Sequence, residues 1–201
     1  MRALSKLIVM AALLVSSAMS SAAVLNVGTW GGSGCCDFGT RGYWFTAPEN
    51  FTISSVYLPM TSVRDSTLQV VRFNSPIPYY ASTTNDFVSL GYWEDVVSAS
   101  TNIAVNTGDI IGILGWADGF TPYRDASGNY ATTLNGHNIT LQRLGFQYLG
   151  TAHDVWTEIG TIGTIGMTYN EGGQTPEPSA LLLLALALSG LWFVRQRVQK
   201  V

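Results

Sequence analysis

The two cysteines of this 201-residue chain, Cys35 and Cys36, are adjacent in the sequence. A trans peptide places neighbouring Cα atoms about 3.8 Å apart, below the roughly 4.4–6.8 Å usual for a disulfide. An internal bond therefore needs a strained ring, which the glycines nearby could accommodate. The pair is a candidate vicinal disulfide with a flat apolar contact surface. A bridge to another molecule and a pair without a binding role are the alternatives. Consecutive sulfurs do not match zinc-site spacing.

Histidines and carboxylates offer little for acid–base or nucleophilic chemistry. His137 and His153 stand at no motif spacing from a nucleophile, and the sequence Gly-x-Ser-x-Gly does not occur. Glu94 and Asp95 form an acidic dipeptide, but neighbours on a strand point to opposite faces. They therefore cannot flank a sugar as the two carboxyls of a glycosidase do, at about 5 or 6.5–9.5 Å. We expect no catalytic residue, no cofactor and no metal; a secreted polysaccharide hydrolase or lyase is the alternative.

Aromatic side chains carry most of the functional content of the sequence. Five Trp, nine Tyr and seven Phe lie between Val24 and Pro178. An exposed ring can hold a sugar, because the sugar's C–H face lies on the ring while its hydroxyls reach polar neighbours. Packing in a core explains most of these rings equally well. The candidate carbohydrate contacts are four rings near turn or polar residues: Tyr80, Trp93, Trp116 and Tyr123.

The elements that must position these rings are short runs rich in Val, Ile, Thr, Tyr and Phe, separated by turn residues. Nine or ten such strands predict a jelly-roll-like β-sandwich over residues 24–171. The expected strands are Val24–Trp30, Gly42–Thr46, Phe51–Pro59, Thr67–Phe73, Asp86–Trp93, Thr101–Val105, Asp109–Trp116, Tyr130–Leu134, Asn138–Gln142 and Thr164–Tyr169.

Three local patterns make this arrangement more specific. Asn135–Gly136 supplies the two positive-φ positions of a type I′ turn, which predicts a hairpin of the strands on either side. The near-continuous apolar run Asp109–Trp116 predicts a central strand covered on both faces. The pair Ser54–Ser55 indicates a bulge. Around it we expect two residues on each face of the strand, namely Phe51 with Ile53 and Val56 with Leu58.

The charge of the central region limits its partners. Between Val24 and Pro178 there are five arginines, no lysine and all 13 acidic residues, which leaves a net charge of −8. A net negative surface argues against nucleic acid and anionic lipid as ligands. It suits an extracellular protein that meets polysaccharide through neutral contacts.

The first stretch, Met1–Ala23, has the features of a secretory signal peptide. Arg2 and Lys6 form its basic region, Leu7–Val15 is apolar, and small residues follow. We expect cleavage after Ala23, with cleavage after Ala22 as the second choice. An uncleaved amino-terminal helix is the alternative.

The last stretch separates into three pieces after a linker at residues 172–175. Two prolines one residue apart, Pro176 and Pro178 with Glu177 between them, cannot lie inside a helix. An uncharged run follows, which predicts a transmembrane helix at about 180–194. As a helix, its residues reach roughly 24 Å, short of a hydrocarbon core of about 30 Å. Arg195 and Arg197 then keep the terminus in the cytoplasm.

Pro176, Glu177 and Pro178, the apolar run and the basic Arg195 and Arg197 together resemble the PEP-CTERM sorting signal of exported bacterial proteins. The resemblance covers residues 176–201 and implies recognition by an exosortase, which removes the helix and passes the rest of the protein outward. The chain departs from the pattern in having Gln196 between the arginines and in continuing to Val201. A plain membrane anchor is the alternative.

The resemblance also implies what the exported part does, because such sorting systems accompany exopolysaccharide production. We expect export by the Sec machinery, a membrane-anchored precursor, and a final place at the cell surface or in the extracellular biofilm matrix. The sandwich is then a non-enzymatic binding or structural module associated with exopolysaccharide. Exosortase is its transient processing partner, and nucleic acid is not expected as a partner.

Overall fold

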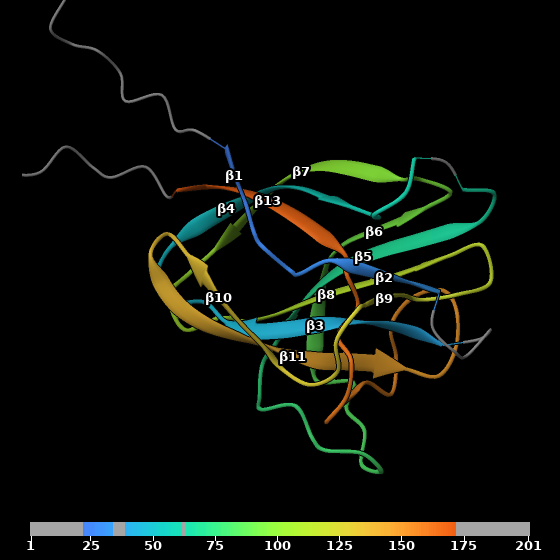
Figure 1. The fold of residues 1–201 in the computed structure, drawn as a ribbon. Helices are drawn as coiled ribbons and strands as arrows, with labels where there is room; N and C mark the ends of the chain where they lie inside the picture. The colour runs from blue at the N-terminus through green and yellow to red at the C-terminus, as the bar shows by residue number, and fades with distance from the viewer. Residues whose placement is uncertain (1–21, 34–38, 62, 172–201) are drawn as a thin grey trace, which may run out of the picture. The chain divides into compact units, whose positions relative to one another are not determined.

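Alternating and apolar runs of the sequence form thirteen strands in the part of the chain that the computed structural model describes, residues 22–33, 39–61 and 63–171. The chain divides into two units, residues 1–171 and 172–201, and the described residues all belong to the first. The prediction of an all-β sandwich is confirmed (Figure 1).

Two antiparallel sheets and a short ribbon make up the body. The four-stranded sheet has, in order, β1 (Ala22–Val24), β13 (Gly166–Glu171), β4 (Phe51–Tyr57) and β7 (Ser98–Val105). The seven-stranded sheet has, in order, β10 (Tyr130–Leu134), β11 (His137–Phe146), β3 (Thr40–Thr46), β8 (Ile110–Ala117), β5 (Ser66–Phe73) and β6 (Phe87–Glu94), with β12 (Trp156–Glu158) beside β11. The ribbon pairs β2 (Trp30–Ser33) with β9 (Pro122–Arg124).

The pairing of eight of these strands is nested. β5 pairs with β6, β4 with β7, β3 with β8, and β1 with β13, so each of these pairs is enclosed in the chain by the one named after it. Folding such a nested hairpin across two sheets produces the connectivity of a jelly roll. The strands β10, β11 and β12 extend the seven-stranded sheet beyond β3.

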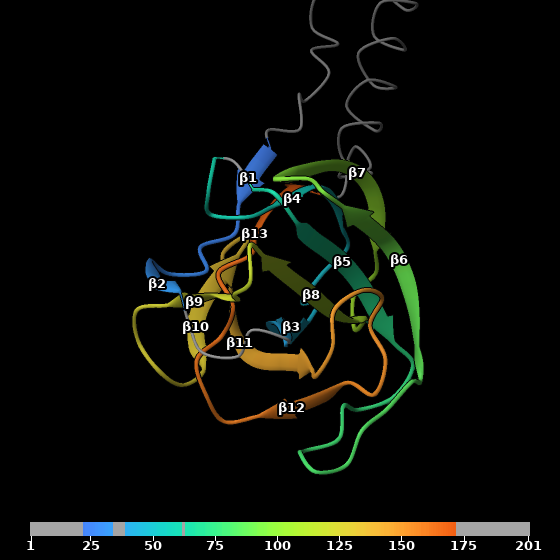
Figure 2. The same cartoon turned by 90° about the vertical axis from the view of Figure 1, so that its right-hand side faces the viewer.

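Apolar side chains cover both faces of the seven-stranded sheet. The larger cluster lies between the two sheets and includes Phe45, Ile53, Ile113 and Met167, all fully buried. A second cluster on the opposite face includes Leu114 and Leu144, and Val155 and Trp156 pack there from the segment after β11. Figure 2 shows β1, β4, β7 and β13 together on one side of the body and β12 on the other.

The central strand and the hairpin are confirmed. β8 lies between β3 and β5 and is buried over nearly its whole length. Asn135 and Gly136 have φ values of 50° and 80° between the paired strands β10 and β11. The left-handed conformation at both positions is what a type I′ turn requires.

The bulge in β4 is confirmed, but its consequence differs from the expectation. The register of β4 shifts between Ile53 and Ser55 against both of its neighbours, β7 and β13. The extra residue resets the alternation of side chains. Val56 and Leu58 therefore join Phe51 and Ile53 in the same core cluster rather than pointing to the opposite face.

The prediction of a single strand at Val24–Trp30 is wrong, because the chain forms β1 and β2 there with a turn between them. Asn26 Oδ1 accepts a hydrogen bond of 2.9 Å from the Gly28 amide. Gly28 has φ 84°, a conformation that glycine adopts without a Cβ penalty. This Asx-type turn ends one strand and redirects the chain into the next.

Most predicted segments at the chain ends lie outside the described residues. These are the signal peptide except for Ala22 and Ala23, which belong to β1, the linker at residues 172–175, and the transmembrane helix at about 180–194. Within residues 22–33, 39–61 and 63–171, no helix is long and apolar enough to span a membrane.

Gly42 provides a test of how tightly the sheet is packed. A Cβ at this position would lie 1.8 Å from the Ile113 carbonyl oxygen of β8, which cannot move without breaking the sheet. We expect Gly42→Ala to lower the free energy of unfolding by about 1–3 kcal/mol or more. Chemical denaturation measures this change. Thr133→Ala, on the exposed side of β10, is the control and should change it by less than about 0.5 kcal/mol; equal effects would contradict the packing.

Candidate functional site

Of the four rings predicted to contact carbohydrate, Tyr80 is exposed and Trp93 is half-buried. Tyr80 keeps 59% of its surface accessible, and its ring centroid lies 5.3 Å from that of Trp156. Trp93 is the register partner of Leu68 and packs against the cluster between the sheets. It thus points mainly inward.

Trp116 and Tyr123 are buried, each only 8% exposed, so the expectation of freely exposed rings is wrong for both. Tyr123 lies beneath the Arg143 guanidinium, which is 5.2 Å from the ring centroid. Trp116 pairs with Thr67 and so occupies the face of the sheet opposite to that of Trp93. The four rings therefore do not form one binding surface.

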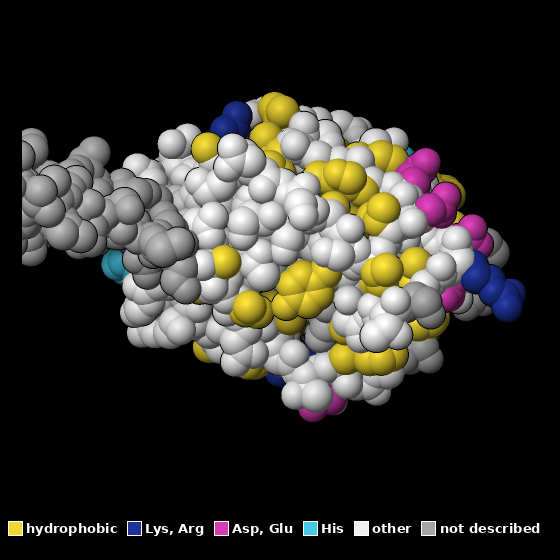
Figure 3. Space-filling model, turned by 90° about the horizontal axis from the view of Figure 1, so that it is seen from above, with side chains coloured by type: hydrophobic (Ala, Val, Ile, Leu, Met, Phe, Trp, Pro, Cys, Tyr) yellow, Lys and Arg dark blue, Asp and Glu magenta, His cyan; other side chains and the backbone are white. Residues whose placement is uncertain are grey.

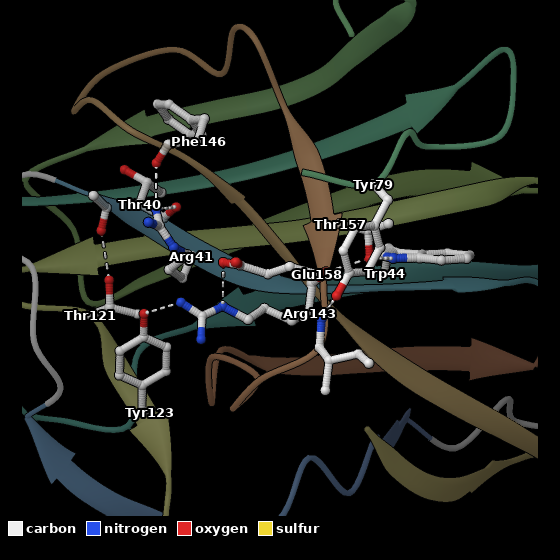
Figure 4. Close-up of polar contacts among 12 residues, drawn as sticks. Thr40, Arg41, Trp44, Tyr79, Thr121, Tyr123, Arg143, Phe146, Thr157 and Glu158 are labelled. Atoms are coloured by element: carbon white, nitrogen blue, oxygen red, sulfur yellow. Dashed lines mark hydrogen bonds and ion pairs between the residues drawn. The ribbon is translucent and has the colours of Figure 1, made fainter. Parts of the chain in front are cut away.

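A polar cluster around Arg143 explains the burial of Tyr123 (Figure 4). The guanidinium forms an ion pair of 3.1 Å with Glu158 and donates a hydrogen bond of 3.1 Å to the Tyr123 hydroxyl. The Thr157 hydroxyl donates to the Arg143 carbonyl and accepts from the Trp44 indole. These contacts connect β3, β9, β11 and β12, and their role is to hold the strands together.

Arg41 lies close to this cluster and is also buried (Figure 4). Its guanidinium donates to the carbonyls of Thr40 and Phe146 and lies 5.1 Å from the Trp156 ring centroid. Carbonyl oxygens and the ring face replace the water that the cation loses on burial. Arg41 is thus part of the packing of the sheet and is not a surface group available to a ligand.

One hollow of the described surface is a groove of about 460 Å³ beside β1 and β4. We call it the Trp30–Tyr57 groove. Its volume lies within the roughly 300–1,000 Å³ of small-ligand sites. It is lined by Val24, Leu25, Asn26, Val27, Gly28, Trp30, Tyr57, Pro59, Thr164 and Gly166.

Local contacts hold both rings of the groove in place. The Trp30 side chain is 40% exposed, and its indole N–H donates a hydrogen bond of 2.8 Å to the Gly32 carbonyl. Tyr57 ends β4 opposite Gly166 of β13. A Cβ on Gly166 would lie 2.2 Å from the Tyr57 ring, so the glycine leaves the space that the ring fills. The two aromatic faces are therefore fixed before any ligand arrives.

The lining of the groove is uncharged. It offers ring faces, aliphatic surface and the Asn26 side chain, which together suit the C–H faces and hydroxyls of a neutral sugar. It offers no carboxyl pair for glycoside hydrolysis. Seen from above, the side of the molecule that carries β1, β4 and β13 is mostly uncharged, and acidic side chains gather at one end (Figure 3).

Sequence reasoning did not select Trp30 and Tyr57 as ligand contacts. Both stand at ends of expected strands, where a ring can be either core or surface. A signal was present at Trp30, because the following Gly31 and Gly32 have no side chains to cover the indole. At Tyr57 the bulge decides the direction of the ring, and the alternation of residues alone does not reveal it.

Other predicted sites lie outside the described residues. They are the cysteine pair Cys35 and Cys36 and the sorting residues Pro176, Glu177, Pro178, Arg195 and Arg197. In the part of the chain that is described, no three His, Cys, Asp or Glu side chains are grouped so as to hold a metal ion.

The described part of the chain is an all-β sandwich that carries an uncharged groove with two aromatic rings. Residues 174–198 match the PEP-CTERM protein-sorting motif. The resemblance seen at Pro176–Pro178 is thus confirmed, and the chain is a PEP-CTERM domain-containing exosortase substrate, exported and sorted through its C-terminus. Comparison with curated proteins and with solved structures gave no significant match.

The ion pair of the polar cluster allows a stability test. Removing the carboxylate in Glu158→Ala leaves the largely buried Arg143 without its charged partner. We expect the free energy of unfolding to fall by about 1–3 kcal/mol, the range for leaving a buried polar group without its partner. Chemical denaturation provides the measurement, with Asp125→Ala at an exposed position as the control. An unchanged stability would show that the pair does not hold β12 to β11.

Proposed function

We propose that the sandwich is a non-enzymatic module that binds extracellular polysaccharide in the Trp30–Tyr57 groove and associates with an exopolysaccharide matrix. The observation that carries this proposal is the groove itself, in which two preset aromatic rings stand within an uncharged lining. Stacking on such rings is the usual way in which a protein holds a neutral sugar face.

Charge supports a neutral polymer as the ligand. The region between Val24 and Pro178 carries a net charge of −8, so an anionic polymer is repelled at long range. A neutral chain feels no such repulsion.

The alternative is a secreted polysaccharide hydrolase or lyase. One observation favours it. Asp65, Glu94 and Asp95 line a smaller pocket at the ends of β5 and β6. Two carboxyls on opposite sides of a sugar are what hydrolysis needs. The groove with the aromatic rings has none, which favours binding without turnover.

Export sets where this binding takes place. We propose that the precursor crosses the inner membrane through the Sec machinery and is held there by the segment at about 180–194 until exosortase acts. The sandwich then reaches the cell surface or the extracellular matrix. Its partners are in this view exosortase, for a short time, and polysaccharide thereafter.

Changing Trp30 tests the binding site. We expect Trp30→Ala to weaken binding of neutral glucan and N-acetylhexosamine oligosaccharides by about tenfold, the equivalent of 1.4 kcal/mol, because one stacking face is lost. Titration calorimetry on the purified protein measures the affinity. Tyr80→Ala, at an exposed ring away from the groove, is the control and should bind normally.

The purified protein also distinguishes binding without turnover from hydrolysis. Incubation with each oligosaccharide, followed by an assay for new reducing ends, should give no product. Product that disappears in Glu94→Gln would establish the hydrolase. Absence of binding by any oligosaccharide, with the protein folded, would overturn the binding module.

Changing the sorting triplet tests processing. With Pro176, Glu177 and Pro178 all replaced by Ala, exosortase loses the sequence that it recognises, and we expect the full-length form to accumulate in the membrane fraction. Immunoblotting of membrane and medium fractions reads the outcome. Replacing the linker residue Gly172, which lies outside the matched motif, with Ala is the control and should leave release unchanged; release of the triplet variant at the normal rate would contradict the prediction.

A further inference from the structure

A second, smaller pocket lies at the end of the seven-stranded sheet, on the face away from the core between the sheets. Its volume is about 190 Å³, which equals the liquid volume of roughly six water molecules at about 30 Å³ each. We call it the Glu94 pocket. It is lined by Asp65, Ser66, Thr67, Tyr92, Glu94, Asp95, Trp116, Leu149 and Gly150.

The register of three strands brings its side chains together. Trp116 of β8 pairs with Thr67 of β5, which pairs with Glu94 of β6, so these three form a row across the sheet. Tyr92 stands two residues before Glu94 and shares its face. The loop after β11 contributes Leu149 and Gly150 to the lining and is held by a hydrogen bond of 2.7 Å from the Ala152 amide to Gln69.

Two polar groups in this row lack a hydrogen-bond partner. Thr67 and Trp116 are each more than nine-tenths buried, and neither the Thr67 hydroxyl nor the Trp116 indole N–H has a hydrogen-bond partner among the described residues. Leaving a buried polar group unpaired costs about 1–3 kcal/mol. Such groups beside a pocket indicate a site whose occupant supplies the missing partners.

Charge indicates what kind of occupant fits. The lining carries three carboxylates, from Asp65, Glu94 and Asp95, and no basic side chain. Asp118 adds a fourth acid nearby, because its Oδ1 accepts hydrogen bonds from the amides of Arg64 and Asp65. Arg64 itself is exposed and does not line the pocket. The local potential therefore attracts a cation and repels an anion.

One carboxylate is already oriented. The Tyr92 hydroxyl donates a hydrogen bond of 2.6 Å to Glu94 Oε1, which fixes the direction of the carboxylate. Burial, followed by this hydrogen bond, raises the pKa of Tyr92 well above its usual range, so the hydroxyl stays a donor at every physiological pH. The remaining lone pairs of Glu94 are free to accept from a ligand.

We propose that the Glu94 pocket binds the primary ammonium group of an amino sugar, such as a glucosamine unit that carries no acetyl group. The ammonium donates to the carboxylates of Glu94 and Asp95, while the sugar ring lies against Tyr92 and Trp116. A hydroxyl of the sugar is placed to pair with Thr67. The volume admits one ring, so the pocket recognises a single unit or a chain end.

This site is independent of the Trp30–Tyr57 groove, because no residue lines both. It also differs in what it selects. The groove recognises ring faces whatever their substituents, whereas the Glu94 pocket recognises a positive charge. An N-acetyl group removes that charge and a uronate reverses it, so acetylation of the polymer decides whether the second site is filled.

Titration of the purified protein with three oligosaccharides tests the proposal. We expect a β-1,4-glucosamine oligomer to bind at least tenfold more tightly than its N-acetylated counterpart, and an oligouronate not to bind at this site. The preference should weaken as salt rises, because exposed charges are screened beyond about 10 Å at 0.1 M ionic strength. Equal binding of the amine and the N-acetylated oligomer would overturn the proposal.

Matched variants test whether the preference for the amine oligomer arises in the Glu94 pocket. Glu94→Gln keeps the size and the hydrogen bond to Tyr92 but removes the charge, and Asp95→Asn does the same at a position with φ 55°, which Asn tolerates. Each should lower the affinity for the amine oligomer roughly tenfold. Asp125→Asn, an exposed acid outside the pocket, should not. Unchanged affinity in both pocket variants, or displacement of the amine oligomer by Ca²⁺ or by a lysine peptide at equal concentration, would refute an amino-sugar site.

Discussion

The structure depends on the covering of both faces of β8. This strand is buried along nearly its whole length, with Ile111 and Ile113 in the core between the sheets and Leu114 in the cluster on the opposite face. A strand so apolar cannot leave either face to water without losing roughly 25 cal/mol per Å² of buried apolar area. Two further layers are therefore required, the four-stranded sheet on one side and the segment after β11 on the other.

Each of these layers generates one hollow. The uncharged Trp30–Tyr57 groove lies in the layer of the four-stranded sheet, beside β1, β4 and the turn at Asn26–Gly28. The Glu94 pocket lies on the opposite face of the seven-stranded sheet, where the loop after β11 meets the ends of β5 and β6. The two hollows differ in charge because they belong to different layers. A polymer with mixed neutral and cationic units meets a suitable surface on each.

Two buried arginine side chains help to cover the face of the seven-stranded sheet that lies opposite the four-stranded sheet. Arg143 draws β9, β11 and β12 together through Glu158 and Tyr123, and Arg41 fills the space beside Trp156. The region Val24–Pro178, of 155 residues, has only five arginines. At least two of the five are committed to packing, which leaves the surface more negative than the composition suggests.

Features that depend on neighbouring residues could be predicted from the sequence. The hairpin at Asn135–Gly136 needs only two residues with positive φ, and β8 shows itself by its apolar run. The sorting signal is likewise local, and the match over residues 174–198 covers it. Features that depend on which face is covered could not be predicted. Trp116 and Tyr123 stand near turn or polar residues in the sequence, but both are buried in the folded protein, Tyr123 beneath Arg143. A single bulge turns Val56 to the side of Ile53.

The pairing of β1 with β13 has a mechanical consequence. Ala22 lies opposite Asn170, so the first and last strands described are neighbours and the chain enters and leaves the sandwich at one edge. Tension between these two ends opens that ladder bond by bond, as a zipper opens, and does not load its hydrogen bonds in shear. Val24 and Leu25 line the Trp30–Tyr57 groove, so traction that peels β1 away distorts this groove first, whereas the Glu94 pocket, built on β5, β6 and β8, is reached only later.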